Sequence, residues 1–322
     1  MEATVQREQN VLYGCEKLAR LTTAVLHRPG EELYLINESN HVDWLFDRVP
    51  DVAGYIAEHD AYRQLLQACG VEVFELGDYV HENRALMRRL PNLTFLHDIA
   101  VLTSKGAILS AMAWKARKDE QKVVREALVG LGVPILVEFD AEAGDAFEGC
   151  LLLSHETVLV AHTERHNGAA VGKFMRQIRR YFKEVVYVDI PRARRYMHPD
   201  TIYNRVSERL AIAYLPAFRD TFLYTNGATE RIDFEHFMSQ KGVEIINVSD
   251  EEQRKLACTF VVVEPGMILH YDTALSGRTQ RALARRGVEL VLFHPEAMTA
   301  GGGSLRCHTL RLHRGDARRK PG

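Results

Sequence analysis

The stretch AGYIAEHDAYRQLLQACGVEVFEL, residues 53–76, contains the pattern that decides the fold. Residues 53–69 have the apolar spacing of a helix, and Gly70 follows them as a stop signal. Residues 71–76 then alternate in the manner of a strand with one buried face. A helix that ends at glycine and leads directly into a strand is typical of α/β proteins.

The same arrangement of helix, stop and strand recurs three more times. The predicted helices are 122–131, 170–182 and 278–286, and the predicted strands that follow them are 133–138, 184–189 and 288–293. Gly132 and Gly287 are the stops after the first and the third of these helices. Repetition at intervals of roughly 50 to 90 residues predicts an α/β protein built from internal repeats. No linker rich in Pro, Ser or Gly divides the chain, so we expect one domain over residues 1–322, with ends 1–20 and 314–322 peripheral.

The composition excludes several classes of protein. With 46% hydrophobic and 26% charged residues the chain is of ordinary globular type, and its formal charge of −2 argues against a nucleic-acid binder. The basic segment 311–320 is expected to be a solvated terminus. No apolar run approaches the ~20 residues of a membrane span, and the first residues lack a secretory pattern. We therefore expect neither a nucleic-acid nor a membrane partner.

The five cysteines are scattered and include no CxxC pair. An odd number of unpaired cysteines predicts neither a disulfide framework nor a zinc site, and favours a reducing, cytoplasmic location. Cys307 follows Gly301, Gly302 and Gly303, whose flexibility allows a close approach of the backbone to a ligand. A thiol there can serve as a nucleophile, or it can be a small buried side chain after a turn; the spacing leaves both open.

Two segments place a histidine and a carboxylate two residues apart. They are His198-Pro199-Asp200 and His270-Tyr271-Asp272, and the spacing alone does not choose between them. A histidine beside a carboxylate suits proton transfer next to a group that binds a cation. Asp98 ends the apolar segment 92–97, where a carboxylate is either a ligand contact or a turn former.

Taken in chain order, several motifs resemble those of the arginine deiminases, guanidine-modifying enzymes of the pentein superfamily. The matching segments are VLHRPGEEL (25–33), LFDRVP (45–50), EHD (58–60), GVEV (70–73), PNLTFLHD (91–98), MHPDTIY (197–203), EPG (264–266), YD (271–272), GVE (287–289) and GGGSLRC (301–307). The family has PNLxFxRD and MHLDTVF at the two segments that contain Asp98 and His198. The resemblance spans nearly the whole chain.

This resemblance implies the α/β propeller fold of the penteins, with five ββαβ-type units, and it implies roles for individual residues. Cys307 would attack the guanidinium carbon, and His198 would protonate the leaving amine and then activate water. Asp98 and Asp200 would hold the guanidinium by charge-assisted hydrogen bonds. Glu148 would stand at the glutamate of the family's EGGD motif. The residues implied to bind the α-carboxylate of the substrate and its surroundings are Asn92, Arg117 and Arg165.

The chemistry fits these residue types independently of the resemblance. A guanidinium is a weak electrophile, and carboxylates can orient it while its charge stabilises a nearby thiolate. Covalent attack gives a thiouronium, which water converts to a ureido product. No metal or organic cofactor is needed, so none is expected. If Arg117 and Arg165 bind a carboxylate, the substrate is an amino acid of arginine type.

The chain also departs from the family pattern. Gly149 and Cys150 replace the Gly-Gly-Asp expected after Glu148, so Glu142, in the alternative alignment Glu142-Ala143-Gly144-Asp145, remains a second candidate for the active-site glutamate. His97 stands where the family has arginine. The arginine expected a few residues before the nucleophile is missing, although Arg306 precedes Cys307 directly. A helical insertion before the PNLTFLHD segment is absent, and we expect an altered carboxylate end of the substrate pocket.

Three functions are compatible with this pattern. The leading prediction is a cysteine hydrolase that converts L-arginine or a close derivative to a citrulline-type product and ammonia. The first alternative is an amidinotransferase, in which an amine acceptor takes the place of water. The second is a non-catalytic binding protein, which the presence of Cys307, His198 and Asp98 disfavours. The substrate is expected to be a small molecule, and homo-oligomerisation is left open.

Overall fold

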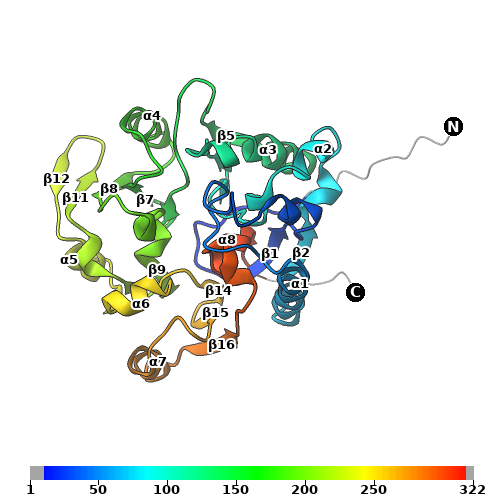
Figure 1. Cartoon of the computed structure of the whole chain (residues 1–322). Helices are drawn as coiled ribbons and strands as arrows, with labels where there is room; N and C mark the ends of the chain where they lie inside the picture. Colours follow the sequence, from blue (N-terminus) through cyan, green and yellow to red (C-terminus); the bar gives the residue numbers. More distant parts are fainter. Residues whose placement is uncertain (1–10, 317–322) are drawn as a thin grey trace, which may run out of the picture.

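A computed structural model describes residues 11–316, whose strands form five sheets (Figure 1). In every sheet an inner strand pairs antiparallel with a middle strand, and the middle strand pairs parallel with an outer strand. The inner strands are β3 (Ala100–Thr103), β6 (Leu151–Leu152), β9 (Tyr203–Ser207), β14 (Val261–Glu264) and β17 (Leu310–Arg314). The middle strands are β1 (Leu21–Leu26), β4 (Gly106–Leu109), β7 (Thr157–His162), β10 (Leu210–Ala213) and β15 (Met267–Tyr271). The outer strands are β2 (Glu72–Glu75), β5 (Ile135–Glu138), β8 (Glu184–Asp189), β13 (Glu244–Asn247) and β16 (Glu289–Phe293).

A helix joins the middle strand to the outer strand in each sheet, because a parallel pair needs a crossover connection. These helices are α1 (Val52–Ala68), α3 (Glu120–Gly130), α4 (Gly168–Ile178), α5 (Phe234–Gln240) and α7 (Gly277–Ala284). Each sheet with its helix is therefore one ββαβ unit. The predicted α/β fold of repeated ββαβ units is confirmed. No helix among residues 11–316 is long and apolar enough to cross a membrane.

Shorter elements complete the structure. They are α2 (Arg84–Met87), α6 (Asp250–Arg254), α8 (Leu305–His308), and the 3-10 helices η1 (Glu31–Leu35), η2 (Leu76–Tyr79), η3 (Pro91–Thr94), η4 (Lys115–Arg117), η5 (Arg194–Tyr196), η6 (Pro199–Thr201), η7 (Leu215–Ala217) and η8 (Met298–Gly301). Strands β11 (Asp220–Tyr224) and β12 (Thr229–Arg231) extend one sheet beyond β8. Only η2 and α2 lie between β2 and η3, where the family's helical insertion was expected to be absent.

The four predicted repeats correspond to α1–β2, α3–β5, α4–β8 and α7–β16, and the structure adds a fifth, α5–β13. The β11–β12 hairpin separates α5 from its middle strand β10, which hides this unit in the sequence. Its glycine stop is Gly242, with φ of 76°, and Val243 and Glu244 follow it as Val71 and Glu72 follow Gly70. The repeated Gly-Val-Glu was the available signal.

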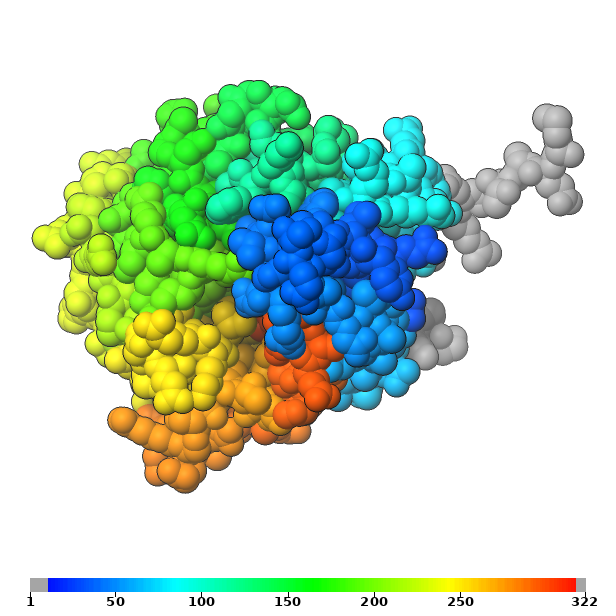
Figure 2. Space-filling view, in the orientation of Figure 1, coloured from blue at the N-terminus to red at the C-terminus, as the bar shows by residue number. Residues whose placement is uncertain are grey.

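Both ends of the chain contribute to one sheet, since β17 pairs with β1. Figure 2 shows the N-terminal part and the segment around α8 side by side on the surface. The expectation of peripheral ends is wrong for parts of 11–20 and 314–316: the backbone N–H of Cys15 donates to Leu102 O at 3.0 Å, and Arg314 is buried. Within the basic segment 311–320, Arg311 and Arg314 belong to β17; residues 1–10 and 317–322 lie outside the described residues.

Apolar clusters between sheets and helices hold the units in place. In the first unit, Tyr55, Tyr62 and Leu66 of α1 are fully buried in one cluster with Leu26 of β1 and Leu305 of α8. Burial of side chains of this size contributes roughly 1.5–3 kcal/mol each. This packing positions α8, and therefore Cys307, against the first unit.

Candidate active site

The candidate residues lie in the loops that enter the inner strands. Asp98 precedes β3, Glu148 precedes β6, His198 and Asp200 precede β9, and Cys307 lies in α8 just before β17. Each inner strand belongs to a different unit, and the loops that enter these strands bring the side chains together at one pocket. The repeat architecture thus gathers residues, such as Asp98 and Cys307, that are more than two hundred positions apart in the sequence.

The pocket is a cavity of about 50 Å³. The sequence-predicted residues that line it are Asn92, Asp98, Arg117, Arg165, His198, Asp200 and Cys307. Glu148 is fully buried behind His198 and contacts it from the protein side. The structure therefore brings all eight predicted residues into one constellation.

Glu148 holds the imidazole of His198. Glu148 Oε2 accepts a hydrogen bond from His198 Nε2 at 2.8 Å, and Oε1 accepts one from the backbone N–H of Ala113 at 2.8 Å. Burial by itself would raise the pKa of Glu148, but the charge of Arg165 and the hydrogen bond from His198 lower it well below the ordinary value. An ionised carboxylate can only accept, so the proton of this pair lies on Nε2. The other ring nitrogen, Nδ1, has no partner among residues 11–316 and can exchange a proton with a ligand.

The two alternatives left open by the sequence are placed elsewhere. Glu142 is exposed in the loop before Glu148 and does not line the pocket. His270 is fully buried in β15 against Phe260, with 5.7 Å between the ring centroids. Asp272, its neighbour in the second His-x-Asp segment, binds His294 instead. Among the two histidines and two glutamates, only His198 and Glu148 contact each other.

The glycines before Cys307 are needed for packing against Phe95. A Cβ atom on Gly301 or Gly303 would lie 2.5 Å from atoms of the Phe95 ring, which is well inside van der Waals contact. Gly302 has φ of 71°, a conformation that favours glycine. These glycines were expected to allow approach to a ligand. All three line the pocket themselves, and Gly301 and Gly303 also allow close approach of Phe95, which lines it too.

The thiol of Cys307 is half-buried and hydrogen-bonded. Ser304 Oγ donates to Thr259 O at 2.6 Å, which uses its only proton, so the thiol is the donor in the 3.6 Å contact between Cys307 Sγ and Ser304 Oγ. Burial, followed by the negative charge of Asp200, raises the pKa of Cys307 to about 12. Cys307 therefore carries a neutral thiol when the pocket contains no cation.

A chain of donors holds Asp200. Asp200 Oδ2 accepts from Arg306 Nε at 3.0 Å and from His97 Nε2 at 3.1 Å. Arg311 donates to His97 Nδ1 at 3.1 Å, and because guanidinium nitrogens only donate, the His97 proton must lie on Nε2. Burial and the charges of Arg311 and Arg306 lower the pKa of His97 to about 4, so this ring is neutral. Arg306 and His97, which stand at two of the departures from the family pattern, both bind the same carboxylate.

The two arginines predicted to bind a substrate carboxylate already bind carboxylates of the protein. Arg117 forms two hydrogen bonds with Asp98 and donates through Nε to Glu120 at 2.9 Å. Arg165 Nη1 lies 3.4 Å from Glu148 Oε2. A substrate carboxylate would have to share these guanidiniums, in line with the expected change at that end of the pocket.

Sequence reasoning missed Arg194, which also lines the pocket. Its side chain is 40% exposed, donates to Leu45 O at 2.7 Å and pairs with Asp47 at 3.0 Å. Its position four residues before His198 was the available signal. Leu45 and Leu256 also line the pocket, and both have positive φ, 62° and 65°. Backbone strain in leucine is concentrated at this site, as is common where a binding surface must be held in place.

Asp98, Glu148 and His198 offer ligand atoms within 4.8 Å of one another, the spacing of a metal site. The guanidiniums of Arg117 and Arg165 pair with the two carboxylates of this set. These positive charges would repel a divalent cation at the same atoms. The two carboxylates of this set therefore already have counter-charges within the protein, which disfavours a metal ion at these atoms.

Comparison with known proteins supports the interpretation from geometry. The family model described as "Arginine deiminase" matches residues 78–314, which is more than half of the chain. The chain belongs to the arginine deiminase family. It is thereby placed among the hydrolases that act on amidine C–N bonds. One curated relative is the arginine deiminase of Listeria welshimeri. It is 26% identical over an alignment 345 residues long, which covers 92% of this chain and 83% of the relative.

Solved structures share the fold at low sequence identity. The DDAH of Pseudomonas aeruginosa, complexed with citrulline, has a TM-score of 0.66 at 16% identity, covering 91% of this chain and 99% of its own. AgrE in a ternary complex with ornithine and NAD+ has a TM-score of 0.69 at 16% identity, covering 92% of this chain. This chain spans only 40% of AgrE. These similarities establish the pentein-type fold.

Proposed function

We propose that the protein hydrolyses the guanidino group of L-arginine or a close derivative to a ureido product and ammonia. The observation that carries this proposal is the pocket itself: a thiol, Cys307, faces two carboxylates, Asp98 and Asp200, while His198 is held by Glu148 from behind. Two carboxylates suit a planar cation with several N–H donors. A thiol beside that cation suits covalent attack at its central carbon.

In the first step, the bound guanidinium offsets the negative charge that raises the pKa of Cys307. The thiol then passes its proton to His198, and the sulfur forms a bond to the guanidinium carbon. His198 donates a proton to the departing nitrogen, which leaves as ammonia, and a thiouronium remains on Cys307. His198 next accepts a proton from water as the water oxygen bonds to the same carbon. Cleavage of the C–S bond releases the ureido product; the remaining proton of the added water passes to the sulfur and His198 gives up its proton to solvent, which restores Cys307 and His198.

Glu148 acts through His198 in this scheme. Glu148 keeps a proton on Nε2 of His198 by accepting a hydrogen bond from it at 2.8 Å, and its charge stabilises the imidazolium that forms in each cycle. Removing the charge by Glu148→Gln should lower kcat by about 10²-fold or more, as expected for loss of acid–base function. Glu142→Gln, an exposed glutamate in the same loop, is the matched control and should retain the wild-type rate.

The alternative is transfer of the amidino group to an amine. Both reactions form the same covalent intermediate, so the acceptor decides between them. The test is incubation with L-arginine, with and without glycine as acceptor, followed by mass spectrometry of products and intact protein. Citrulline and ammonia without acceptor support hydrolysis. Ornithine that forms only with glycine supports transfer, whereas ornithine without acceptor indicates removal of both terminal nitrogens.

Thiol variants keep this test specific. Cys307→Ala should abolish turnover and any covalent adduct, while Cys69→Ala, another incompletely buried free cysteine, should retain both. Turnover that survives Cys307→Ala would refute the covalent mechanism. Absence of product and adduct in the wild type, first with L-arginine and then with modified arginines, would refute the proposed hydrolysis and favour a binding function.

A further inference from the structure

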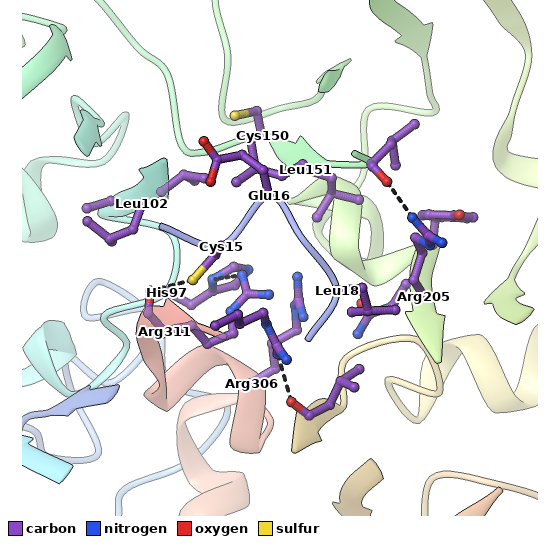
Figure 3. Close-up of a pocket in the computed structure, with 18 residues that line it drawn as sticks. Cys15, Glu16, Leu18, His97, Leu102, Cys150, Leu151, Arg205, Arg306 and Arg311 are labelled. Atoms are coloured by element: carbon purple, nitrogen blue, oxygen red, sulfur yellow. Dashed lines mark hydrogen bonds between the residues drawn. The ribbon is translucent and has the colours of Figure 1, made fainter. Parts of the chain in front are cut away.

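A second cavity lies among the inner strands (Figure 3). Its volume is about 50 Å³, several times the 10–15 Å³ that one ordered water needs. Residues from all five inner strands line it, together with the segment 15–18 and Arg306 of α8. It therefore lies on the common centre of the repeated units. In Figure 3, Arg306 and Arg311 lie toward one side of it and Arg205 lies across from them.

The lining of this cavity is strongly cationic. Four arginines contribute to it: Arg205, Arg306, Arg311 and Arg314. Within residues 11–316, Arg306 alone of the four has a carboxylate within 4.0 Å, namely Asp200. The lining contains a single carboxylate, that of Glu16, which accepts from the backbone N–H and the hydroxyl of Ser104 and forms no ion pair with these arginines.

Two donors in this lining are buried and unpartnered. The Nε–H groups of Arg205 and Arg311 have no hydrogen-bond partner in the part of the chain that the structure describes, although both atoms are inaccessible to solvent. Arg314 is 6% exposed, and its two hydrogen bonds go to the neutral carbonyl oxygens of Ala19 and Val262. Burial, with a further contribution from the charge of Arg306, lowers the pKa of Arg314 to about 10.

A cationic cavity of this kind is costly without a bound counter-ion, because each buried charge without a counter-charge and each unmade hydrogen bond destabilises the fold. A bound anion would remove both costs. Guanidiniums bind oxyanions in particular, since their planar forks match the geometry of carboxylate and phosphate. We propose that this central cavity binds a small oxyanion, a phosphate-like ion or the carboxylate of a small acid.

Two residues connect this anion site to the pocket of Cys307. Arg306 and His97 line the second cavity, and both hydrogen-bond Asp200, which lines the first. An anion that pairs with Arg306 weakens its hold on Asp200 and leaves more of that carboxylate for a cationic ligand. The binding proposal does not depend on this coupling, nor on the function proposed above.

The binding test uses inorganic phosphate and acetate as separate probes, with sodium chloride adjusted to keep ionic strength constant. Thermal unfolding should shift upward by about 2 °C or more at saturating oxyanion, and titration calorimetry should give a stoichiometry near one. A response to phosphate alone identifies a phosphate-like ligand, whereas a response to acetate as well identifies a carboxylate site. No shift and no heat with either probe would overturn the proposal.

Variants locate the site. Arg311→Gln and Arg205→Gln should each weaken anion binding at least tenfold. The control is Arg209→Gln, because Arg209 is exposed, lies two residues after β9 and does not line the cavity. This variant should bind the anion as the wild type does. If one variant fails to fold, as judged by circular dichroism, the other still decides. Undiminished binding in the folded variant, or binding that is lost in Arg165→Gln instead, would place the anion elsewhere and refute the inference.

Discussion

The electrostatics of Cys307 lead to a quantitative prediction for alkylation. A pKa of about 12 leaves roughly one thiol in 10⁵ ionised at pH 7, whereas about one in 30 is ionised for an unperturbed cysteine. A thiolate of higher pKa is intrinsically more nucleophilic, which recovers a factor of about 40. Iodoacetamide should therefore modify Cys307 about 10²-fold more slowly than a free cysteine at pH 7, and the rate should rise about tenfold per pH unit up to pH 10.

Asp200→Asn provides the perturbation. Burial is the first cause of the raised pKa and the charge of Asp200 is the second, so removal of that charge should lower the pKa of Cys307 by on the order of one unit. Alkylation at pH 8 should then become about threefold faster even though turnover is lost, because tenfold more thiolate is offset in part by its lower nucleophilicity. The rate is read at the Cys307 peptide by mass spectrometry, which separates it from modification of Cys15 and Cys69.

The control is Glu142→Gln, which removes an exposed carboxylate outside the pocket. It should leave the rate and its pH dependence unchanged. A wild-type rate that is independent of pH between 7 and 10 would refute the assignment of a neutral thiol. A rate that falls in Asp200→Asn would show that Asp200 does not raise the pKa of Cys307.

Three further predictions concern proton transfer, packing and pH. His198→Ala should reduce kcat at least 10²-fold, because it removes the group proposed to transfer protons. His270→Ala should lower stability, since His270 is fully buried, but leave the kcat of the folded protein unchanged. An equal loss of kcat in both variants would contradict the choice of His198. Gly303→Ala should destabilise the fold by about 1–3 kcal/mol in urea unfolding, because its Cβ would collide with Phe95. The control Gly168→Ala, with open space around the new Cβ, should be neutral or stabilising by about 0.4–1 kcal/mol. Similar effects of the two substitutions would show that the contact with Phe95 is not tight. His27 lies 3.5 Å from Glu32 and 3.6 Å from Glu75, and although burial opposes it, these carboxylates raise its pKa to about 9. The resulting stabilisation of the folded state, up to about 3 kcal/mol, is present below pH 6.5 and is lost as the pH rises through 9. The unfolding free energy of the wild type should therefore fall between pH 6.5 and 9 relative to that of His27→Gln. Parallel curves of unfolding free energy against pH would refute the raised pKa of His27.

Much of the fold could be predicted because its repeats are local in the sequence. A glycine in the left-handed conformation ends a helix and starts a strand at Gly70, Gly132 and Gly287, and each of these signals lies within a few residues. The helix–stop–strand pattern found only four of the five units that the family resemblance implied, because a hairpin insertion, β11–β12, separates α5 from β10 in the fifth. The prediction of peripheral ends failed for Cys15 and Arg314, because Cys15 hydrogen-bonds to Leu102 and because β17, which ends at Arg314, pairs with β1 almost 300 positions away.

The candidate site could be assembled in advance only through the family resemblance. Sequence spacing alone did not show whether His198 or His270 is the active-site histidine, or whether Glu148 or Glu142 is the active-site glutamate. Burial and tertiary contacts distinguish the members of each pair. The roles of Arg306 and His97 beside Asp200 also required the three-dimensional structure, since Asp200 lies more than a hundred residues from Arg306. The unpaired charges of Arg311 and Arg314 were hidden by their position in a segment that reads as a solvated terminus.

The most direct test of the proposed mechanism is turnover of L-arginine in water enriched in ¹⁸O. Hydrolysis through Cys307 predicts one ¹⁸O atom in the ureido group of the product for each ammonia released, with no product from Cys307→Ala. A product that lacks ¹⁸O, or product that still forms in Cys307→Ala, would contradict attack of water on a covalent intermediate at this cysteine.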